Sequence, residues 1–431
     1  MSTIVISDGQ VLGPDGSVSR ADVLVDQATG TVREVGPDLA GDRTLSAAGG
    51  LVMPGLVNAH THAAMTLLRG LADDKPLDAW LQEDIWPAEA ALEPADVRAG
   101  TDLAVLEMIR SGTTAFADMY FHMDEVVEAV EQAGLRARLS HGIVTVGKDE
   151  AGATADVEEG IDFARRADGA ADGRVQTAIS PHSLTTVNED ALEATVAAAR
   201  EIGVPLHLHA NETTDEVEPI VAEHGVRPLE YAAEKGLLAP EDFFAHGVHL
   251  AETEVELLAD RAPGVVHCPA SNMKLASGMA PVETLRSADV PLALGTDGAA
   301  SNNDLDMFDE MRDAALLGKL AAEDASAVPA EAVVEMATAG GAAALGLPGG
   351  RIEAGATADL IVVDFQSPRM TPVHDYVSHL AYAAQGSDVR HTVVDGQVLM
   401  RDRTVQTLDE AAVRERAAER AGTLATRADV R

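Results

Sequence analysis

Nine residues, Pro54-Gly55-Leu56-Val57-Asn58-Ala59-His60-Thr61-His62, form a short apolar run that ends in two histidines spaced two positions apart. In an extended strand this spacing puts both imidazoles on the same side. Neutral imidazole nitrogens suit a zinc-class metal, which needs only one or two further ligands from elsewhere in the chain. The run therefore predicts one wall of a metal site at the end of a buried strand.

The charge of the chain is extreme. Its 431 residues include 31 basic and 71 acidic side chains, a net charge of −40, and the acidic residues are spread along the sequence. Such self-repulsion destabilises a compact chain in dilute buffer, whereas molar salt screens it, because the Debye length falls to ~3 Å at 1 M. We interpret the charge as adaptation to a salty cytoplasm, in preference to an acidic interaction surface. It also argues against nucleic acid or an anionic membrane as a partner.

The chain carries no sign of a membrane or secretory protein. No apolar run approaches the roughly 18 residues needed to span a bilayer. The first residues, Met1 to Asp8, lack the basic start and the long apolar core of a signal peptide. A single cysteine, Cys268, excludes an internal disulfide and fits a reducing compartment. We expect a cytoplasmic homo-oligomer that acts on a small molecule.

Both ends of the chain have the pattern of short strands separated by turns such as Pro14-Asp15-Gly16 and Asp395-Gly396. Neither end is long enough to form a stable domain alone, so we expect one small composite β-sandwich from residues 1–55 and 346–431. An alanine-, glutamate- and arginine-rich stretch from Leu408 to about Thr426 predicts a surface helix. The expected strands are Thr3–Ser7, Val11-Leu12, Asp22–Asp26, Thr31–Val35, Ala358–Asp364 and His391–Met400.

Between the two ends, short apolar runs alternate with helical segments. This α/β pattern predicts a (β/α)₈ TIM-like barrel over residues 56–345, with an elaborated first loop. The expected strands are Leu51–Asn58, Thr113–Asp118, Ala137–His141, Val175–Ser180, Pro205–His209, Phe243–His246, Gly264–Cys268 and Pro291–Asp297. The expected helices include Ala95–Arg110, Met123–Ala133, Glu189–Ile202, Val217–Glu234 and Glu252–Arg261.

Polar residues stand where these strands end, which is where active sites of such barrels lie. They are His60, His62, Asp118, His141, His182, His209, His246, His267 and Asp297. The strongest candidates for metal ligands are His60, His62, His209 and Asp297. His207 shares a face with His209 but lies one layer deeper, so we assign it a structural role.

These segments carry a clear resemblance. PGLVNAHTH (54–62), HANE (209–212), HCPASNMKL (267–275) and GTDGAASNNDLDMFDEMR (295–312) resemble the amidohydrolase superfamily. More narrowly, the chain is similar to the 5-methylthioadenosine/S-adenosylhomocysteine deaminases. That narrower likeness depends mainly on LLRG (67–70), Trp80, IWPAE (85–89), DMYFH (118–122) and SPHS (180–183).

The resemblance implies a single divalent metal, zinc, held by His60, His62, His209 and Asp297. It makes Glu212 the acid/base and His246 the residue that orients the attacking water. No lysine ends the fourth strand, which disfavours the carbamylated two-metal form of the superfamily. The catalytic residues so implied are Glu212, His246 and Asp297.

The resemblance also implies a substrate pocket for an adenosine-type nucleoside. Glu89 matches the position that holds ribose hydroxyls, Trp80 a lid aromatic, and His182 a contact near the purine and sugar. Ser301 follows the last strand and is expected to line the pocket. The implied substrate contacts are Trp80, Glu89, His182, Glu212, Asp297 and Ser301.

The expected reaction is hydrolytic deamination to an inosine-type nucleoside and ammonia. Adenine C6 is a poor electrophile and neutral water a poor nucleophile, so a metal that lowers the pKa of water to roughly 7 is needed. Glu212 gives a proton to the ring N1 as water attacks. Asp297 takes the proton of the attacking water and passes it to the departing ammonia.

The chain departs from the family pattern at the substrate tail. Members that accept S-adenosylhomocysteine carry two arginines for its carboxylate, where this chain has His141 and the loop Val146–Glu150. Arg136 and Arg138 precede the strand end and are expected to point elsewhere. Lys148 is a point charge without the bidentate fork of arginine. Smaller 5′ substituents, as in methylthioadenosine or 5′-deoxyadenosine, fit this pattern better.

Two alternatives remain open at this point. The same fold and metal could act on guanine, cytosine or an aminotriazine, although Trp80 and Glu89 favour a nucleoside. A non-catalytic metalloprotein or scaffold is the other, against which Glu212, His246 and Asp297 argue. Cytidine-type zinc deaminases are excluded because their P-C-x-x-C motif needs two cysteines. Rossmann and P-loop glycine motifs are also missing from the sequence.

Overall fold

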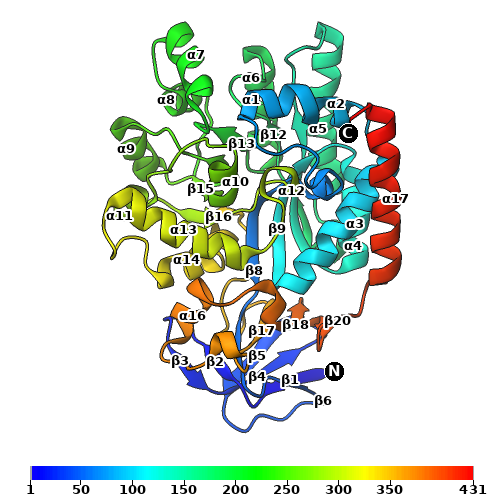
Figure 1. The fold of residues 1–431 in the computed structure, drawn as a ribbon, viewed down its shortest axis with the longest axis vertical. Coiled ribbons are helices and arrows are strands. Elements are labelled where there is room, and N and C mark those ends of the chain that lie inside the picture. The colour runs from blue at the N-terminus through cyan, green and yellow to red at the C-terminus, as the bar shows by residue number, and fades with distance from the viewer. Residues whose placement is uncertain (1, 431) are drawn as a thin grey trace.

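Parallel strands occupy the centre of the molecule. The computed structural model describes residues 2–430, and its central strands form two parallel sheets with helices around them (Figure 1). The first sheet has the order β11-β10-β9-β8, and β12 also pairs with β10. Its strands are β8 (Leu56–Thr61), β9 (Thr113–Tyr120), β10 (Arg136–Ile143), β11 (Val175–Thr177) and β12 (Ser180–Pro181). The second has the order β13-β14-β15-β16, with β13 (His207–Ala210), β14 (Phe243–His246), β15 (Gly264–His267) and β16 (Leu292–Leu294).

Backbone contacts join the two parallel sheets at both of their edges. Parallel bridges pair Ile179 with Leu206 and Ser183 with His209. At the other junction the Asp297 amide donates to the His60 carbonyl at 3.0 Å. The strands therefore follow one another in chain order from β8 to β16, and the end of the last lies beside the first. Their carboxyl ends point the same way, which brings the polar residues after them together.

The strand faces that point away from the helices share a cluster of small and medium side chains. Alanine is its commonest residue, and the segment after Thr338 contributes to one end. Its members include Val57, Ala59, Ala115, Ala117, Ala178, Phe243, Ala245, Val266, Cys268, Ala293, Ala342 and Leu345. A larger hydrophobic cluster fills the space between the strands and the surrounding helices.

Helices alternate with the parallel strands and cover their outer faces. The longer ones end where left-handed residues, most often glycine, stop them: Gly112 after α3 (φ 93°) and Gly134 after α4 (φ 87°). The helices are α1 (Leu77–Trp80), α2 (Trp86–Ala90), α3 (Pro94–Ser111), α4 (Met123–Ala133), α5 (Glu150–Ala167), α6 (Glu189–Ile202), α7 (Thr214–His224), α8 (Pro228–Glu234), α9 (Glu252–Arg261), α10 (Pro269–Lys274), α11 (Val282–Ser287), α12 (Ala299–Asn302), α13 (Met307–Ala322), α14 (Ala330–Met336), α15 (Ala339–Ala344), α16 (Tyr376–Tyr382) and α17 (Glu410–Ala428). Short 3₁₀ or π segments span Ala63–Leu68, Leu81–Ile85, Ala171–Gly173, Pro368–Met370 and Gly386–Asp388.

Strands from both ends of the chain lie together at the lower end of Figure 1. One sheet has the order β5-β4-β1-β6, and the other β20-β19-β18-β17-β7-β2-β3. Both sheets contribute to one apolar cluster that includes Ile4, Ile6, Val23, Val25, Val52, Leu360, Val362 and Val393. The strands are β1 (Thr3–Ser7), β2 (Gln10–Leu12), β3 (Val18–Arg20), β4 (Asp22–Asp26), β5 (Thr31–Gly36), β6 (Arg43–Ser46), β7 (Gly50–Pro54), β17 (Leu360–Asp364), β18 (Val389–Val394), β19 (Gln397–Arg401) and β20 (Thr404–Val405).

The structure corrects three predictions about single elements. The expected strand Leu51–Asn58 is two strands, because β7 pairs with β17 whereas β8 pairs with β9. The chain passes between them at Gly55, where a Cβ atom would lie 2.0 Å from Thr114 Oγ1. The expected helix Val217–Glu234 is two helices, since Gly225 (φ 72°) ends α7. The expected strand Val175–Ser180 is two short strands, β11 and β12, which pair separately with β10.

The remaining predicted elements lie close to their expected bounds. The terminal helix predicted from Leu408 to about Thr426 is α17, which runs beside α3 (Figure 1). Within residues 2–430, none of the helices is both long and apolar enough to cross a membrane.

Candidate metal-dependent active site

A cavity of about 1410 Å³ opens where the parallel strands end. Loops after β8, β9, β10, β12, β13, β14 and β16 line it, because the carboxyl ends of these strands meet at one edge. Most of the site residues predicted from the sequence are among its lining side chains: His62, Trp80, Glu89, His182, His209, Glu212, His246 and Asp297.

Four candidate ligands converge at the base of this cavity. Asp297 Oδ1 lies 3.5 Å from His60 Nε2 and 3.3 Å from His62 Nε2. The Nε2 atoms of His62 and His209 are 3.3 Å apart. They come from three parts of the parallel array: His60 and His62 from the end of β8, His209 from β13 and Asp297 from the segment after β16. This is the spacing of groups that share one ion.

The histidine rings are held so that their Nε2 atoms face one another. His62 Nδ1 donates to the Met119 carbonyl at 2.7 Å, and His209 Nδ1 donates to the His182 carbonyl at 2.8 Å. His60 Nδ1 is 2.8 Å from His207 Nε2. His60 Nε2 is buried and has no hydrogen-bond partner among the described residues. An orphaned nitrogen beside a carboxylate and two further Nε2 atoms is the donor set that a zinc-class ion requires.

Asp297 is fixed in place by its own turn and by two hydroxyl groups. Its backbone is left-handed (φ 60°), a conformation that is uncommon outside glycine. Ser271 Oγ and Ser301 Oγ donate to Oδ2 at 2.6 and 2.9 Å, and the Gly298 amide donates to Oδ1 at 2.8 Å. The Oδ1 atom therefore remains the one that faces the histidines.

Burial favours the neutral form of two candidate ligands, His60 and His209, and of His182 beside them. It lowers the pKa of His60 to about 4 and that of His182 to about 3, and it lowers the pKa of His209 well below the ordinary value. Burial acts in the opposite direction on Asp297, but the close imidazoles of His60, His62 and His246 outweigh it, so its pKa lies well below the usual range. A neutral imidazole and an ionised carboxylate are the forms that bind a metal.

Glu212 and His246 face each other above the ligand cluster. Glu212 Oε2 lies 3.5 Å from His246 Nε2, and its Oε1 accepts a hydrogen bond from Ser277 Oγ at 3.0 Å. His246 Nδ1 is 3.0 Å from Asn272 Oδ1. Burial raises the pKa of Glu212, which favours its protonated form. Burial lowers the pKa of His246, but Glu212 and Asp297 outweigh this and raise it.

The structure places most of the predicted substrate contacts in the cavity, but not all of them. Trp80, Glu89 and His182 line the cavity, and burial raises the pKa of Glu89 to about 7. Ser301 does not line it, since its hydroxyl is behind Asp297. His267 does not line it either. Its neighbours Val266 and Cys268 belong to the interior cluster, and alternation along the strand turns His267 to the opposite face.

Four further residues contact the predicted site residues; His207 was assigned a structural role from the sequence, and the other three were not singled out. His207, Ser271, Asn272 and Ser277 contact His60, Asp297, His246 and Glu212 respectively. Three of them lie in or just after α10, which follows β15 directly. Their signal was a run of small polar residues after a strand, SNMKLAS, which is too common to identify a role.

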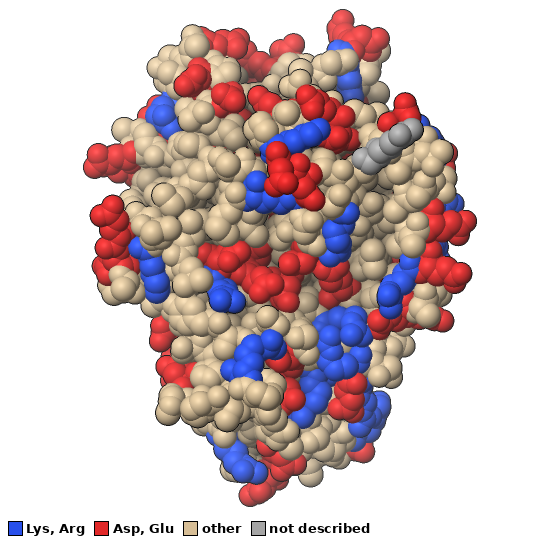
Figure 2. Space-filling model, viewed as in Figure 1, with Lys and Arg blue, Asp and Glu red and all other residues tan. Residues whose placement is uncertain are grey.

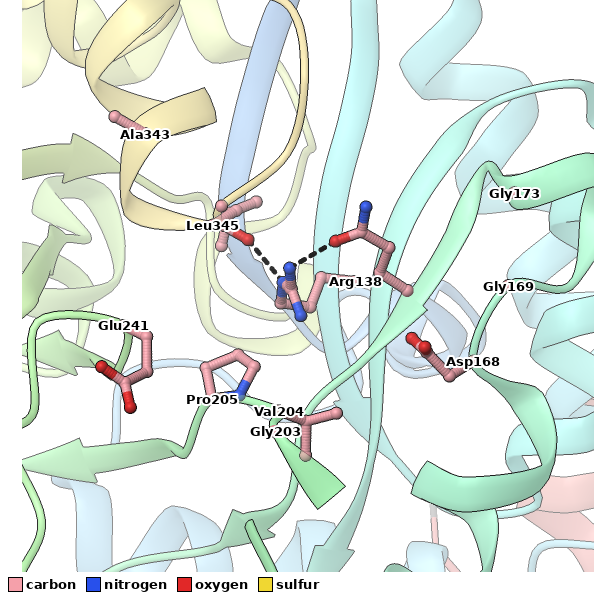
Figure 3. Close-up of a pocket in the computed structure, with 12 residues that line it drawn as sticks. Arg138, Asp168, Gly169, Gly173, Gly203, Val204, Pro205, Glu241, Ala343 and Leu345 are labelled. Carbon is pink, nitrogen blue, oxygen red and sulfur yellow. Dashed lines mark hydrogen bonds between the residues drawn. The ribbon is translucent and has the colours of Figure 1, made fainter. Parts of the chain in front are cut away.

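Arg136 and Arg138 point away from the cavity, as expected. Arg136 Nε donates to Asp359 Oδ2 at 2.9 Å and joins β10 to the segment before β17. Arg138 borders a separate cavity of about 390 Å³ (Figure 3), where it donates to the carbonyls of Leu345 and Thr177 and to Gln176 Oε1. Its guanidinium ties the strands to the segment after α15.

Residues 51–399 match the model of the Amidohydrolase family. The chain belongs to the amidohydrolase family. This amidohydrolase is 68% identical over 426 residues to a protein of Halobacterium salinarum named 5-methylthioadenosine/S-adenosylhomocysteine deaminase, with 99% of each chain covered. It is 46% identical over 432 residues to a Methanosarcina mazei protein named 5′-deoxyadenosine deaminase, again with 99% of each covered.

Solved structures agree with the family. An adenosine deaminase from Xanthomonas campestris with bound zinc is 40% identical to this amidohydrolase and superposes with a TM-score of 0.92 over 98% of both chains. The zinc complex of the atrazine chlorohydrolase TrzN from Arthrobacter aurescens has a TM-score of 0.90 at 23% identity, over 97% of this chain and 100% of that one. The second likeness establishes the fold alone.

Proposed function

We propose that this protein is a zinc-dependent deaminase of adenosine-type nucleosides. The substrates are 5′-methylthioadenosine, S-adenosylhomocysteine, 5′-deoxyadenosine and adenosine, and the products are the inosine-type nucleoside and ammonia. The observation that carries the proposal is Glu212, a buried carboxyl group 3.5 Å from His246, above the four convergent ligands. The names of the relatives at 68% and 46% identity support the same chemistry.

The proposal includes an architecture. We assign residues 56–345 to a (β/α)₈ barrel, supported by the chain-order pairing of the parallel strands and the hydrogen bond from Asp297 to His60. We assign residues 1–55 and 346–431 to a composite β-sandwich domain, supported by the apolar cluster that the two terminal sheets share. The cytoplasmic location and the homo-oligomer stay predictions from the sequence.

One divalent metal would be held by His60, His62, His209 and Asp297. We assign it as zinc, because zinc is commonly bound by histidine nitrogens and carboxylate oxygens. When bound, the ion supplies Lewis acidity and lowers the pKa of water from 15.7 to about 7. The hydrogen bonds of the outer ring nitrogens would orient the ligands, as second-shell partners do in metal sites. Two hydroxyl groups hold Asp297 Oδ2 and would leave Oδ1 for the ion.

The proton steps belong to this chain's own side chains. In its protonated form, Glu212 would give its proton to the purine N1 as water attacks C6, which keeps negative charge off the ring. His246 would orient the attacking water from the other side of Glu212. Asp297 would accept one proton of that water and pass it to the departing amine, which leaves as ammonia, while the hydroxyl proton left on C6 returns to Glu212 as the carbonyl forms.

The nucleoside would be held by groups outside the ligand cluster. Glu89 is placed to accept hydrogen bonds from ribose hydroxyls, and Trp80 to cover the bound nucleoside. His182 reaches the same cavity from the segment after β12. Ser301 lies behind Asp297 and would position that carboxylate. Its effect on the substrate would therefore be indirect, through Asp297.

The deciding experiment is ammonia release from a panel of amines. The enzyme, loaded with zinc and assayed in molar potassium chloride, should deaminate methylthioadenosine and 5′-deoxyadenosine with the highest kcat/KM. Guanine, cytosine and an aminotriazine are the counter-substrates, since the alternative function keeps the fold and metal. Faster turnover of any of these three would overturn the proposal, as would no turnover of any compound.

Metal content gives an independent prediction. Four ligands converge and no lysine ends the fourth strand, so one equivalent of divalent metal per chain is expected after expression with added zinc. Elemental analysis of the purified protein measures it. Two equivalents per chain, or none, would contradict the single-metal site.

A further inference from the structure

The side of the cavity next to β10 carries an unusual balance of charge. Nine of the residues that line the cavity are aspartates or glutamates, whereas Lys148 is the one lysine or arginine among the described lining residues. His141 and Glu159 line the same side. What a substrate tail meets there depends on whether Lys148 is available to it.

Lys148 is already paired with a carboxylate that does not itself line the cavity. Its Nζ lies 2.8 Å from Asp156 Oδ2. Asp156 Oδ1 accepts from His141 Nε2 at 3.1 Å, and Oδ2 accepts from the Val144 amide at 2.8 Å. The Asp156 side chain is only 14% exposed, so solvent screens these contacts weakly.

Asp156 stands on α5 and faces both basic groups at once. Burial raises the pKa of Asp156, but the hydrogen bonds from His141 and Lys148 outweigh burial and lower it, which keeps the carboxylate ionised. One ionised aspartate therefore cancels the lysine charge and occupies a ring nitrogen of His141. Glu159, one turn further along α5, lines the same side and is paired with Arg166 Nη2 at 2.9 Å.

We propose that Asp156 is a specificity-determining residue: by pairing Lys148 and His141, it makes this side of the cavity disfavour 5′ substituents that end in a carboxylate and accept neutral or cationic ones. This inference rests on the proposed deamination of nucleosides. It specifies that, among these nucleosides, the enzyme selects by the charge of the 5′ substituent. A carboxylate tail would have to compete with Asp156 for the lysine, whereas an ammonium tail would add to the pairing.

The first test uses the unaltered enzyme and two tails of similar length. We expect 5′-deoxy-5′-(2-aminoethylthio)adenosine to exceed 5′-deoxy-5′-(carboxymethylthio)adenosine in kcat/KM by at least tenfold, with methylthioadenosine as the neutral reference. Equal values, or a preference for the carboxymethyl compound, would overturn this inference while turnover of methylthioadenosine upholds the proposed function. No turnover of methylthioadenosine would overturn both.

The second test removes the pairing. In Asp156→Asn the lysine is released, and kcat/KM for the carboxymethyl compound should rise at least fivefold relative to methylthioadenosine, mainly through a lower KM. Glu159→Gln is the matched control, since it removes a lining carboxylate on the same helix and keeps the Lys148–Asp156 pair, so the ratio should change less than twofold. An unchanged ratio in folded Asp156→Asn, or an equal rise in Glu159→Gln, would overturn the role of Asp156. If Asp156→Asn fails to fold, the comparison of the two 5′ substituents on the unaltered enzyme still tests the proposed selection by charge.

Discussion

At the scale of single residues, this site depends on which atom of each side chain is left free. His62 and His209 use Nδ1 on backbone carbonyls, and Asp297 uses Oδ2 on two serine hydroxyls. What remains are the Nε2 atoms and Oδ1, which point at one another. Preorganisation of this kind lowers the cost of assembling a metal site, because few side chains have to move when the ion binds.

Glu212→Gln tests the proton donor. The amide keeps the shape of the side chain but cannot move a proton, and general acid/base steps contribute typically 10²–10⁴-fold. Turnover of methylthioadenosine should fall by at least ~10² with metal content unchanged. Glu218→Gln, at an exposed position on the helix α7 that follows Glu212, is the control and should keep full activity. Near-normal turnover in Glu212→Gln would remove Glu212 from the mechanism.

His207→Phe tests the support of a ligand. His207 stacks on Phe243 with ring centroids 4.3 Å apart, so a phenyl ring can fill the space while the partner of His60 Nδ1 is lost. Loss of such a partner typically costs 10–100-fold in metal affinity. Competition with a chelator should show zinc bound about 10-fold or more weakly. His224→Phe, at an exposed position, is the control, and equal affinity in both variants would contradict the role.

At the scale of elements, α3 and α17 illustrate how the termini hold the central strands. Asp96 and Asp102 on α3 are almost fully buried, and both pair with arginines of α17. Asp96 also accepts a hydrogen bond from the Glu93 amide at 2.9 Å, which closes the capping box at the start of α3. One buried carboxylate thus fixes both the start of a helix and the helix beside it.

Asp96→Ala tests this arrangement. Arg427 and Arg420, each about a third exposed, would lose their carboxylate partner and the Glu93 amide its acceptor, and the loss of charge-assisted and capping hydrogen bonds typically costs about 1–3 kcal/mol. The free energy of unfolding, measured by denaturant titration in molar salt, should fall by about that amount. Asp124→Ala breaks an exposed pair with Arg166 and should cost no more than about 1 kcal/mol. Similar losses in the two variants would show that the buried pair adds nothing.

At the scale of the whole molecule, charge dominates. The acidic side chains are spread over the visible face, with lysine and arginine scattered between them (Figure 2). Many of the arginines are committed to pairs such as Arg200 with Asp242 and Arg227 with Glu254. The net charge of −40 is therefore left mostly to exposed carboxylates, whose repulsion only mobile ions can relieve.

Stability should follow salt concentration. The thermal midpoint is expected to rise between 0.1 M and molar potassium chloride, because the Debye length falls from about 10 Å to 3 Å and screens the repulsion. Scanning calorimetry measures it, and sucrose at matched osmolality controls for general solute exclusion. A midpoint that is flat or falling with salt, or one that sucrose raises equally, would contradict adaptation to a salty cytoplasm.

Much of this molecule could be predicted from local sequence. Periodic helices such as Met123–Ala133 and Glu252–Arg261 have the predicted bounds, since apolar spacing and a C-terminal stop act over a few residues. The predictions were wrong where residues far apart in the sequence determine how a segment pairs. Residues 51–58 form two strands because the first half pairs with β17 and the second half pairs with β9.

The sequence by itself determined the α/β class, the parallel strands and the residue types at their ends. Those depend on side-chain periodicity, which is a local property of the chain. Only the tertiary structure decided which atoms meet: that Ser301 lies behind Asp297, that His207 reaches His60, and that Asp156 pairs with Lys148. Each of these contacts joins residues from different elements, and no local pattern specifies the direction or distance at which such side chains meet.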